Sequence, residues 1–463
     1  MAFLIGGANS DSGAYQIDNS LRFSDSNYLT IDNTDENGEG VNFTLSVWLK
    51  MTSYAVGGYQ GIFSVFKDSN DYFEIYKDNS EKLQICQNIN GTNVCYQNQD
   101  FAFHDYSAWY HLVVSFNNSA SGEINKIKVY INGTEISADE KVTNSNPFAD
   151  MGLGDSAYDT RIGAYRDNTS ATWNGYMAEL HLVAGTTLTA SSFGETDDNG
   201  VWIPIKYTGS YGENGFFLEF QETGTSQNAS GMGADTSGNV NHLAVTGLSS
   251  VDVTTDTPTN NFATWNPVYK ASNVTLSEGS CKAAIAGSGQ SRSVMSTIAV
   301  ASGKWYWEIK YTTDVEAGFV SVITTDFNVY GSSLSNNGSD DNVGYISGGN
   351  KYINGSATSY GNGWDDGDIV GVALNIDDNE VVFYKNGTAQ NSGTAISKTF
   401  SGFYYASAQH TSSSGTSNFE VNFGNPTFSI SSGNADANGY GNFEYAVPSN
   451  YYALCTKNLA EYG

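Results

Sequence analysis

The sequence is poor in positive charge. It contains 20 Lys and Arg residues against 49 Asp and Glu residues, which gives a formal net charge of −29 at pH 7. A surface this acidic repels phosphate backbones and anionic bilayers, so nucleic acid is not an expected partner. Such acidity also keeps a protein soluble where salt screens charge, and we therefore expect a saline habitat.

Long apolar runs are also missing. No segment is apolar over the length that a bilayer requires, so we predict no membrane insertion. The first ten residues, MAFLIGGANS, hold a short apolar run with no Lys or Arg before it, unlike a secretory signal peptide. We interpret residues 1–19 as an N-terminal anchoring segment.

Four cysteines in 463 residues are too few for a disulfide framework. Cys86 and Cys95 flank an Asn-Gly pair at 90–91, and a two-residue turn there places them opposite each other on adjacent strands. Counting outward from the turn puts them at a non-hydrogen-bonded position, where the two chains lie closest. We predict cross-strand neighbours, with a disulfide and two packed thiols as open alternatives because the redox compartment is unknown. Cys281 and Cys455 are interpreted as small buried apolar residues.

Proline is scarce and helical periodicity is absent, whereas glycine, tyrosine and phenylalanine are abundant, at 50, 30 and 24 residues. Apolar residues alternate at period two from end to end, which is typical of strands. Asn-Gly pairs at Asn90, Asn132, Asn354 and Asn386 predict two-residue hairpin turns. Because the chain is too long for one growing core, we expect two or three domains. The alternation and the turns predict an all-β protein of antiparallel β-sandwiches, and the resemblances described next imply two of them in tandem.

Residues 20–192 carry a first family resemblance. The strings "FTLSVWLK", "WYHLVVSF", "KVYINGTEI", "RIGAY" and "NGYMAELHL" follow one another there. In that order they resemble a laminin-G-type, concanavalin A-like domain, and this resemblance implies a jelly roll of antiparallel strands. The calcium ligands of other laminin-G domains are not carried over, because no matching motif occurs at defined positions.

Residues 273–430 carry a second resemblance. The string "GDIVGVALNIDDNEVVFYKNG" at 367–387 and "GKWYWEIKY" at 303–311 resemble a SPRY domain. The longer string also reads as a buried strand, a turn, an alternating strand and an Asn-Gly hairpin turn. Since SPRY domains are concanavalin A-like, the resemblance implies a second jelly roll.

Residues 193–272 form a predicted connecting segment. The strings "SSFGETDDNGVWIPIKY", "DTSGNVNHL" and "TDTPTNNFATWNP" resemble linkers in structural proteins of tailed bacteriophages, especially marine ones. Its acidic part begins like an EF-hand loop, but Lys206 stands where the bidentate Glu is required, so we predict a turn. A second near-match at 33–38 fails in the same way at Thr44. Residues 431–463 are left as an ordered tail or interaction segment.

Catalytic patterns are missing. Some concanavalin A-like glycosidases use Glu-x-Asp-x-x-Glu along one strand. Here Glu195 and Asp197 begin that pattern, but Gly200 takes the place of the second Glu. The five histidines are scattered, and His111 and His181 lie within strand motifs where packing is the simpler explanation. We predict no enzyme activity, no metal site and no cofactor.

Two loops combine aromatic residues with amide and charged groups, as sugar-binding surfaces do. The alternative is that their aromatic residues, Trp364 above all, pack into the sandwich cores. The candidate ligand-binding residues are Tyr165, Arg166, Asp167 and Trp173 in the first sandwich, and Tyr360 and Trp364 in the second.

The linker resemblance leads to a functional hypothesis. We expect a structural protein on the surface of a phage virion, in a tail fibre or a capsid appendage, which attaches the particle to a host-surface glycan or protein. Its partners would be other virion proteins and copies of itself, with a trimer expected. The alternatives are a purely architectural capsid-stabilising protein and a secreted bacterial carbohydrate-binding adhesin, which would need an export route.

Overall fold

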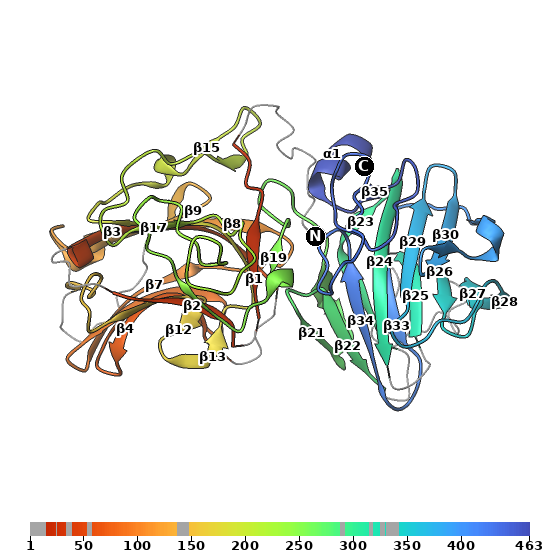
Figure 1. The fold of residues 1–463 in the computed structure, drawn as a ribbon, viewed down its shortest axis with the longest axis horizontal. Coiled ribbons are helices and arrows are strands. Elements are labelled where there is room, and N and C mark those ends of the chain that lie inside the picture. Colours follow the sequence, from red (N-terminus) through yellow and green to blue (C-terminus); the bar gives the residue numbers. More distant parts are fainter. Residues whose placement is uncertain are drawn as a thin grey trace. The chain divides into compact units, whose positions relative to one another are not determined.

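The computed structural model describes residues 15–463 except 25, 34–38, 53–57, 137–147, 288–291, 314–317, 325–328 and 330–341. Its regular structure is almost entirely strand, and the α-helix among the described residues, α1 (Thr456–Tyr462), has seven residues (Figure 1). The chain divides into two compact units, Asp11–Thr259 and a second that includes Asn260–Gly463. Each unit is built around a pair of packed antiparallel sheets, as predicted.

One sheet of the first unit, which we call the back sheet, has eight strands, one of which, β17, lies off the main order and pairs with β14. Its strand order is β10 (Thr134–Ile136), β9 (Ile127–Ile131), β8 (Trp109–Asn117), β3 (Asn42–Met51), β14 (Gly175–Ala184), β1 (Ser20–Phe23) and β19 (Val253–Thr254), with β17 at Phe216–Leu218.

The front sheet of the first unit has seven strands, in the order β18 (Ala244–Thr246), β2 (Tyr28–Asp32), β11 (Asp159–Ile162), β4 (Gln60–Asp68), β5 (Asp71–Lys77), β6 (Lys82–Ile89) and β7 (Thr92–Ala102). Side chains alternate between its two faces. On β5, Phe73 and Ile75 enter the core between the sheets. The intervening Tyr72, Glu74 and Tyr76 therefore lie on the outer face.

Two short hairpins complete the first unit: β12 (Ala164–Tyr165) with β13 (Asn168–Thr172), and β15 (Gly194–Thr196) with β16 (Trp202–Pro204). The second contains the acidic stretch after residue 194. Asp197 Oδ1 accepts the backbone N–H groups of Asn199 and Val201 at 2.9 and 2.8 Å, which lowers the pKa of Asp197. The predicted turn is confirmed.

The predicted connecting segment is divided between the two units instead of forming a linker of its own. Up to Thr259 it belongs to the first unit, where β17, β18 and β19 extend the two sheets. A fully buried ion pair between Lys50 Nζ and Asp256 Oδ2, at 2.7 Å, ties its end to β3. Residues 1–14 of the predicted anchoring segment lie outside the described residues. Ile17 is buried in the first unit, and its backbone groups bond to Thr259 Oγ1 at 3.2 and 2.8 Å.

The second unit also pairs two sheets. One has the order β20 (Trp265–Lys270), β23 (Arg292–Val300), β33 (Tyr404–His410), β25 (Gly318–Thr324), β26 (Val343–Ile346), β27 (Asn350–Ile353) and β28 (Ser356–Ser359). The other has the order β21 (Val274–Ser277), β22 (Lys282–Ala286), β34 (Thr416–Asn422), β24 (Lys304–Thr313), β29 (Ile369–Asn375), β30 (Glu380–Lys385) and β31 (Thr388–Ala389), with β32 (Ile396–Ser397) on β30 and β35 (Tyr452–Ala453) on β24.

The C-terminal residues are part of the second unit. Glu308 on β24 is fully buried, and its carboxylate accepts the backbone N–H groups of Glu444 and Tyr445 at 2.9 and 2.8 Å. Tyr306 Oη at 3.1 Å and Asn422 Nδ2 at 3.3 Å donate to the same carboxylate. Four donors on one carboxylate hold the tail against the sheet.

The four predicted Asn-Gly turns are confirmed. Asn90, Asn132, Asn354 and Asn386 have φ between 47° and 50°, and the glycine after each has φ between 75° and 79°. Positive φ at both central residues matches the right-handed twist of the flanking strands.

Candidate functional site

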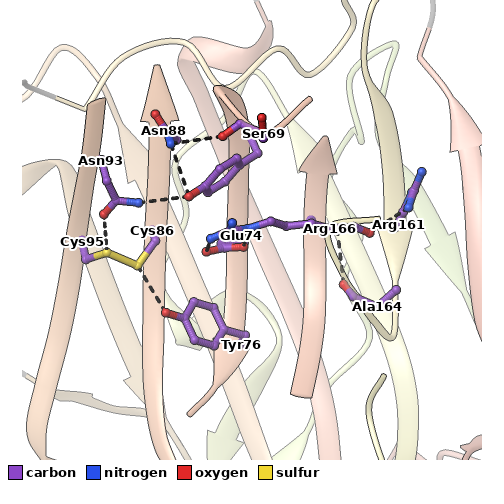
Figure 2. Close-up of polar contacts among 12 residues, drawn as sticks. Ser69, Glu74, Tyr76, Cys86, Asn88, Asn93, Cys95, Arg161, Ala164 and Arg166 are labelled. Carbon is purple, nitrogen blue, oxygen red and sulfur yellow. Dashed lines mark hydrogen bonds and ion pairs between the residues drawn. A yellow bond between two sulfur atoms is a disulfide. The ribbon is translucent and has the colours of Figure 1, made fainter. Parts of the chain in front are cut away.

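The outer face of the front sheet carries a cluster of aromatic and charged side chains, which we call the front-sheet site. Figure 2 shows part of it, with Glu74, Tyr76 and Arg166. Its six residues come from three places in the chain. Tyr72, Glu74 and Tyr76 stand on β5, Tyr59 precedes β4, and Tyr165 and Arg166 come from the hairpin of β12 and β13. The cluster therefore exists only when the hairpin lies over the sheet.

Close packing at a glycine holds this hairpin in place. A Cβ at Gly61 on β4 would lie 2.1 Å from the carbonyl carbon of Ala164 in β12, so only glycine allows the approach. Ser64 Oγ also donates to Ala164 O, at 3.3 Å. At the turn, the Arg166 carbonyl accepts from Arg161 Nη1 at 2.7 Å. The turn is thereby fixed above β5.

Arg166 and Glu74 form a two-point ion pair. Arg166 Nε lies 2.6 Å from Glu74 Oε2, and Arg166 Nη2 lies 2.8 Å from Glu74 Oε1. The Glu74 side chain is 1% exposed and the Arg166 side chain 26% exposed. The guanidinium carbon also lies 3.7 Å from the ring centroid of Tyr72 and 4.7 Å from that of Tyr165. This is the arrangement in which a planar guanidinium is held most firmly.

Electrostatics of the pair follow from its burial. Burial raises the pKa of Glu74, while the hydrogen bonds and the charge of Arg166 oppose that rise, as does a hydrogen bond from Tyr165. Burial and the Glu74 charge raise the pKa values of Tyr76 and Tyr165. Both phenols therefore stay protonated at neutral pH and offer hydroxyl groups, not charges.

Three tyrosine rings pack together in the site, and two of them, Tyr59 and Tyr165, reach its surface. Tyr59, Tyr76 and Tyr165 contact one another pairwise, with ring centroids 4.9 to 5.2 Å apart. Tyr76 is buried beneath the other two, whereas 44% of Tyr59 is exposed. Such an exposed aromatic surface beside hydrogen-bonding groups is suited to ligand binding.

A disulfide lies next to these rings. Cys86 on β6 pairs with Cys95 on β7, their Cα atoms are 4.1 Å apart, and the sulfurs are bonded. Cys86 Sγ is 3.7 Å from Tyr76 Oη. The predicted cross-strand pairing is confirmed, and of the two open alternatives the structure has the disulfide.

The structure brings two of the predicted site residues together and separates the others. Tyr165 and Arg166 belong to the front-sheet site, and the exposed Asp167 shares their turn. Trp173 is fully buried in the core of the first unit. Tyr360 and Trp364 are core residues of the second unit, and they are only 5% and 1% exposed. Tyr360 Oη accepts a hydrogen bond from the Phe383 N–H, and the Trp364 ring packs on Tyr311. The prediction that these three contact a ligand is corrected accordingly.

The other members of the site were missed by sequence analysis. Tyr72, Glu74 and Tyr76 alternate along one strand, so their common face was legible at period two. The pairing of Glu74 with Arg166, 92 residues later, has no local signal. Tyr59 stands in no motif.

A buried serine–histidine pair on the back sheet resembles a catalytic dyad, but the imidazole proton is on the nitrogen that faces the serine. Ser46 Oγ lies 2.8 Å from His111 Nε2, and Trp202 Nε1, which can only donate, lies 2.9 Å from His111 Nδ1. The imidazole proton is therefore on Nε2 and faces the serine, so His111 has no lone pair there to take the serine proton. Burial lowers the pKa of His111 to about 3. The pair is structural.

The described residues show neither a metal-binding cluster nor a membrane-spanning helix. No three His, Cys, Asp or Glu side chains there are grouped so as to hold a metal ion. The predicted turn at 33–38 falls mostly outside the described residues. None of the helices in the described parts is long and apolar enough to cross a membrane.

Comparison with known families decides the nature of both units. Residues 23–192 match the Laminin_G_3 model, described as the concanavalin A-like lectin/glucanases superfamily, and residues 304–425 match the SPRY domain. The chain thus carries a concanavalin A-like domain followed by a SPRY domain. Such lectin-like folds are consistent with binding to carbohydrate or protein.

Other comparisons are more distant. No curated protein matches the chain. The SPRY domain of human HERC1 is 17% identical, over 34% of this chain and 96% of that one, with a TM-score of 0.29. Stonustoxin is 19% identical over 35% of this chain and only 27% of its own, with a TM-score of 0.29. A heptameric SAP-like pentraxin from Limulus polyphemus is 19% identical over 38% of this chain and 80% of its own, with a TM-score of 0.28.

Proposed function

We propose that the chain is a structural protein of a phage virion, in a tail fibre or a capsid appendage, which attaches the particle to its host through the first sandwich. The observation that supports attachment is the front-sheet site, where Tyr59 and Tyr165 present rings beside the Glu74–Arg166 pair. The virion context rests on the sequence resemblance of residues 193–272 to segments of phage structural proteins.

Binding fits this site better than catalysis does. The Glu74 carboxylate accepts two hydrogen bonds from Arg166 and is 1% exposed, so it is neither a free base nor a nucleophile. Tyr76 and Tyr165 remain protonated because burial raises their pKa values. What is left for a ligand is ring surface and hydrogen-bond donors, which hold a molecule without altering it.

Display in many copies suits a shallow site. One exposed ring pair on a sheet face offers little area, so each contact is weak. Joined copies convert later binding events into intramolecular ones, which raises avidity by about 10²- to 10⁴-fold without new contacts. We therefore propose a homo-oligomer, with a trimer as the simplest form, anchored to other virion proteins.

Two experiments test this proposal. Antibody against the chain should label the surface of purified virions by immunogold electron microscopy. Added full-length protein should then compete with virions for adsorption to host cells, and Tyr59→Ala should compete poorly.

The matched control is Tyr269→Ala, which removes a ring that is 55% exposed in the second unit and should compete like the wild type. Absence of the chain from virions would overturn the proposal in favour of a secreted adhesin. Labelling without any competition would favour an architectural, capsid-stabilising role.

A further inference from the structure

The charge balance of the front-sheet site indicates which class of ligand it accepts. We infer that the site selects an uncharged sugar residue, which stacks a C–H face on Tyr59 and Tyr165 and receives hydrogen bonds from Arg166. In this arrangement Arg166 is a specificity-determining residue whose positive charge Glu74 cancels. The inference rests on the proposed attachment function and names the ligand of that same site.

The ring pair sets the shape of the ligand. The Tyr59 and Tyr165 rings are tilted by 31° with centroids 5.2 Å apart, so both are within reach of a single sugar residue. An aromatic face carries partial negative charge, which attracts the slightly positive C–H groups of a sugar and repels an anionic group. Tyr76 supports the pair from below.

The ion pair sets the charge of the ligand. An arginine with a free guanidinium binds sulfate, phosphate or carboxylate strongly. Here Arg166 already meets Glu74 at 2.6 and 2.8 Å, so an anion that approached the guanidinium would also approach a buried carboxylate. Attraction and repulsion then largely cancel, and the chain's net charge of −29 adds further repulsion. Hydrogen bonding remains, and neutral hydroxyl groups can accept it.

The turn is organised before the ligand arrives. Arg166 has φ 54°, a left-handed conformation that a long side chain rarely adopts. Backbone strain of this kind persists only where the surroundings enforce it, and it clusters at functional sites. The Glu74 pair, the hydrogen bond from Arg161 and the hairpin packing at Gly61 enforce it here. A donor held in one orientation favours discrimination between sugar hydroxyl configurations.

A sugar fits the site better than a peptide does. A peptide that joins a sheet binds along a free strand edge through main-chain hydrogen bonds. The site lies instead on the face of the sheet, where β4 and β5 are each paired with neighbours on both sides. Only side-chain recognition is available, and the exposed side chains are rings and donors.

The test measures binding of the full, oxidised chain to a panel of neutral, carboxylated and sulfated oligosaccharides. Neutral sugars should bind, with an affinity that changes little between 50 and 500 mM salt, chosen as about a tenfold range around physiological ionic strength. Tyr59→Ala should weaken this binding at least about tenfold, which corresponds to removal of one stacking ring. Tyr269→Ala should bind like the wild type.

Glu74→Gln provides the decisive variant, because it keeps the shape of the side chain and restores the charge of Arg166. It should gain affinity for sulfated sugars by several-fold, with a steep salt dependence, and circular dichroism and the melting temperature check that it folds. If Glu74→Gln does not fold, Arg166→Lys is the alternative variant. A lysine cannot reproduce the two-point pairing with Glu74, so selectivity among neutral sugars should fall.

Wild-type preference for acidic sugars would overturn the inference, as would binding to a host protein and to no sugar. In both cases virions that carry the chain on their surface would leave the proposed function standing. Absence from virions would remove the function, while sugar selectivity could still be measured on the purified protein.

Discussion

Removing either partner of the Glu74–Arg166 pair should destabilise the first unit by very different amounts. Arg166→Met leaves a carboxylate that is 1% exposed without a counter-ion, and such a stranded charge costs about 3 kcal/mol or more. Glu74→Gln leaves a guanidinium that is 26% exposed and reaches water, so we expect a cost of about 1 kcal/mol. The double variant Glu74→Met with Arg166→Met should cost less than Arg166→Met alone, because no charge is then buried.

The penalty of Arg166→Met should also depend on pH. Burial already raises the pKa of Glu74, and loss of Arg166 removes the group that opposes this rise. A carboxyl whose folded-state pKa lies above its unfolded-state value is stabilised at low pH and loses that stability as the pH rises through the folded-state pKa. The destabilisation should therefore be large at pH 7.5. As the pH is lowered from the folded-state pKa to the unfolded-state pKa of Glu74, it should shrink by about 1.4 kcal/mol for each pH unit.

Urea unfolding of the full chain, followed by circular dichroism and tryptophan fluorescence, measures these costs. Only the transition of the first unit should move. The matched control is Lys385→Met, which breaks a solvent-accessible pair with Asp368 in the second unit and should cost less than about 1 kcal/mol. Equal costs for Arg166→Met and Glu74→Gln, or a cost for Arg166→Met that does not change with pH, would refute the reasoning.

Three further perturbations test other parts of the account. Reduction of the Cys86–Cys95 disulfide, or replacement of both cysteines by serine, should destabilise the first unit by at most about 2.5 kcal/mol, as expected for a closed loop of about ten residues. The same change should weaken sugar binding. An unchanged urea midpoint would contradict this prediction. Lys77→Met should raise the melting temperature, because Lys77 Nζ is buried without a hydrogen-bond partner in the described structure. Burial lowers the pKa of Lys77, so the stability of the wild type should rise as the pH approaches 10.5. The stability of the variant should lack this pH dependence. Glu308→Gln places an amide N–H₂ against two backbone N–H donors. Hydrogen exchange at the Glu444 backbone amide should therefore become faster, by a factor equivalent to about 1–3 kcal/mol. An unchanged exchange rate would argue against the observed packing of the tail.

Local chemistry made part of the fold predictable. The Asn-Gly turns follow from residues that tolerate positive φ, and the turn at Asn90 alone fixes which residue faces Cys86. The acidic hairpin near Asp197 was predictable for the same reason, since its carboxylate caps its own backbone. In each case the information lies within about ten residues.

The boundaries of the units depend on packing that the local sequence does not reveal. Strands β17, β18 and β19 have two or three residues each, too few to show a period-two pattern. They are strands because the two sheets offer free edges for them. The segment 193–259 therefore resembled a linker in composition although it belongs to the first unit.

The candidate site was predictable only in part, because residue type does not determine which face a side chain occupies. Tyr165 and Trp173 lie on the same hairpin, yet the first contributes to an exposed cluster and the second fills the core. Large aromatic side chains serve both purposes. The pairing of Arg166 with Glu74 required the hairpin to cross β4 at Gly61, which is a tertiary event.

The most direct measurement is a crystal structure of the oxidised full chain with a neutral oligosaccharide selected from the binding panel. The account predicts one sugar ring in van der Waals contact with Tyr59 and Tyr165, with a hydroxyl within hydrogen-bond distance of the Arg166 guanidinium and the Glu74–Arg166 pair intact. A sugar bound at another place on the chain, with the front-sheet site empty, would contradict it.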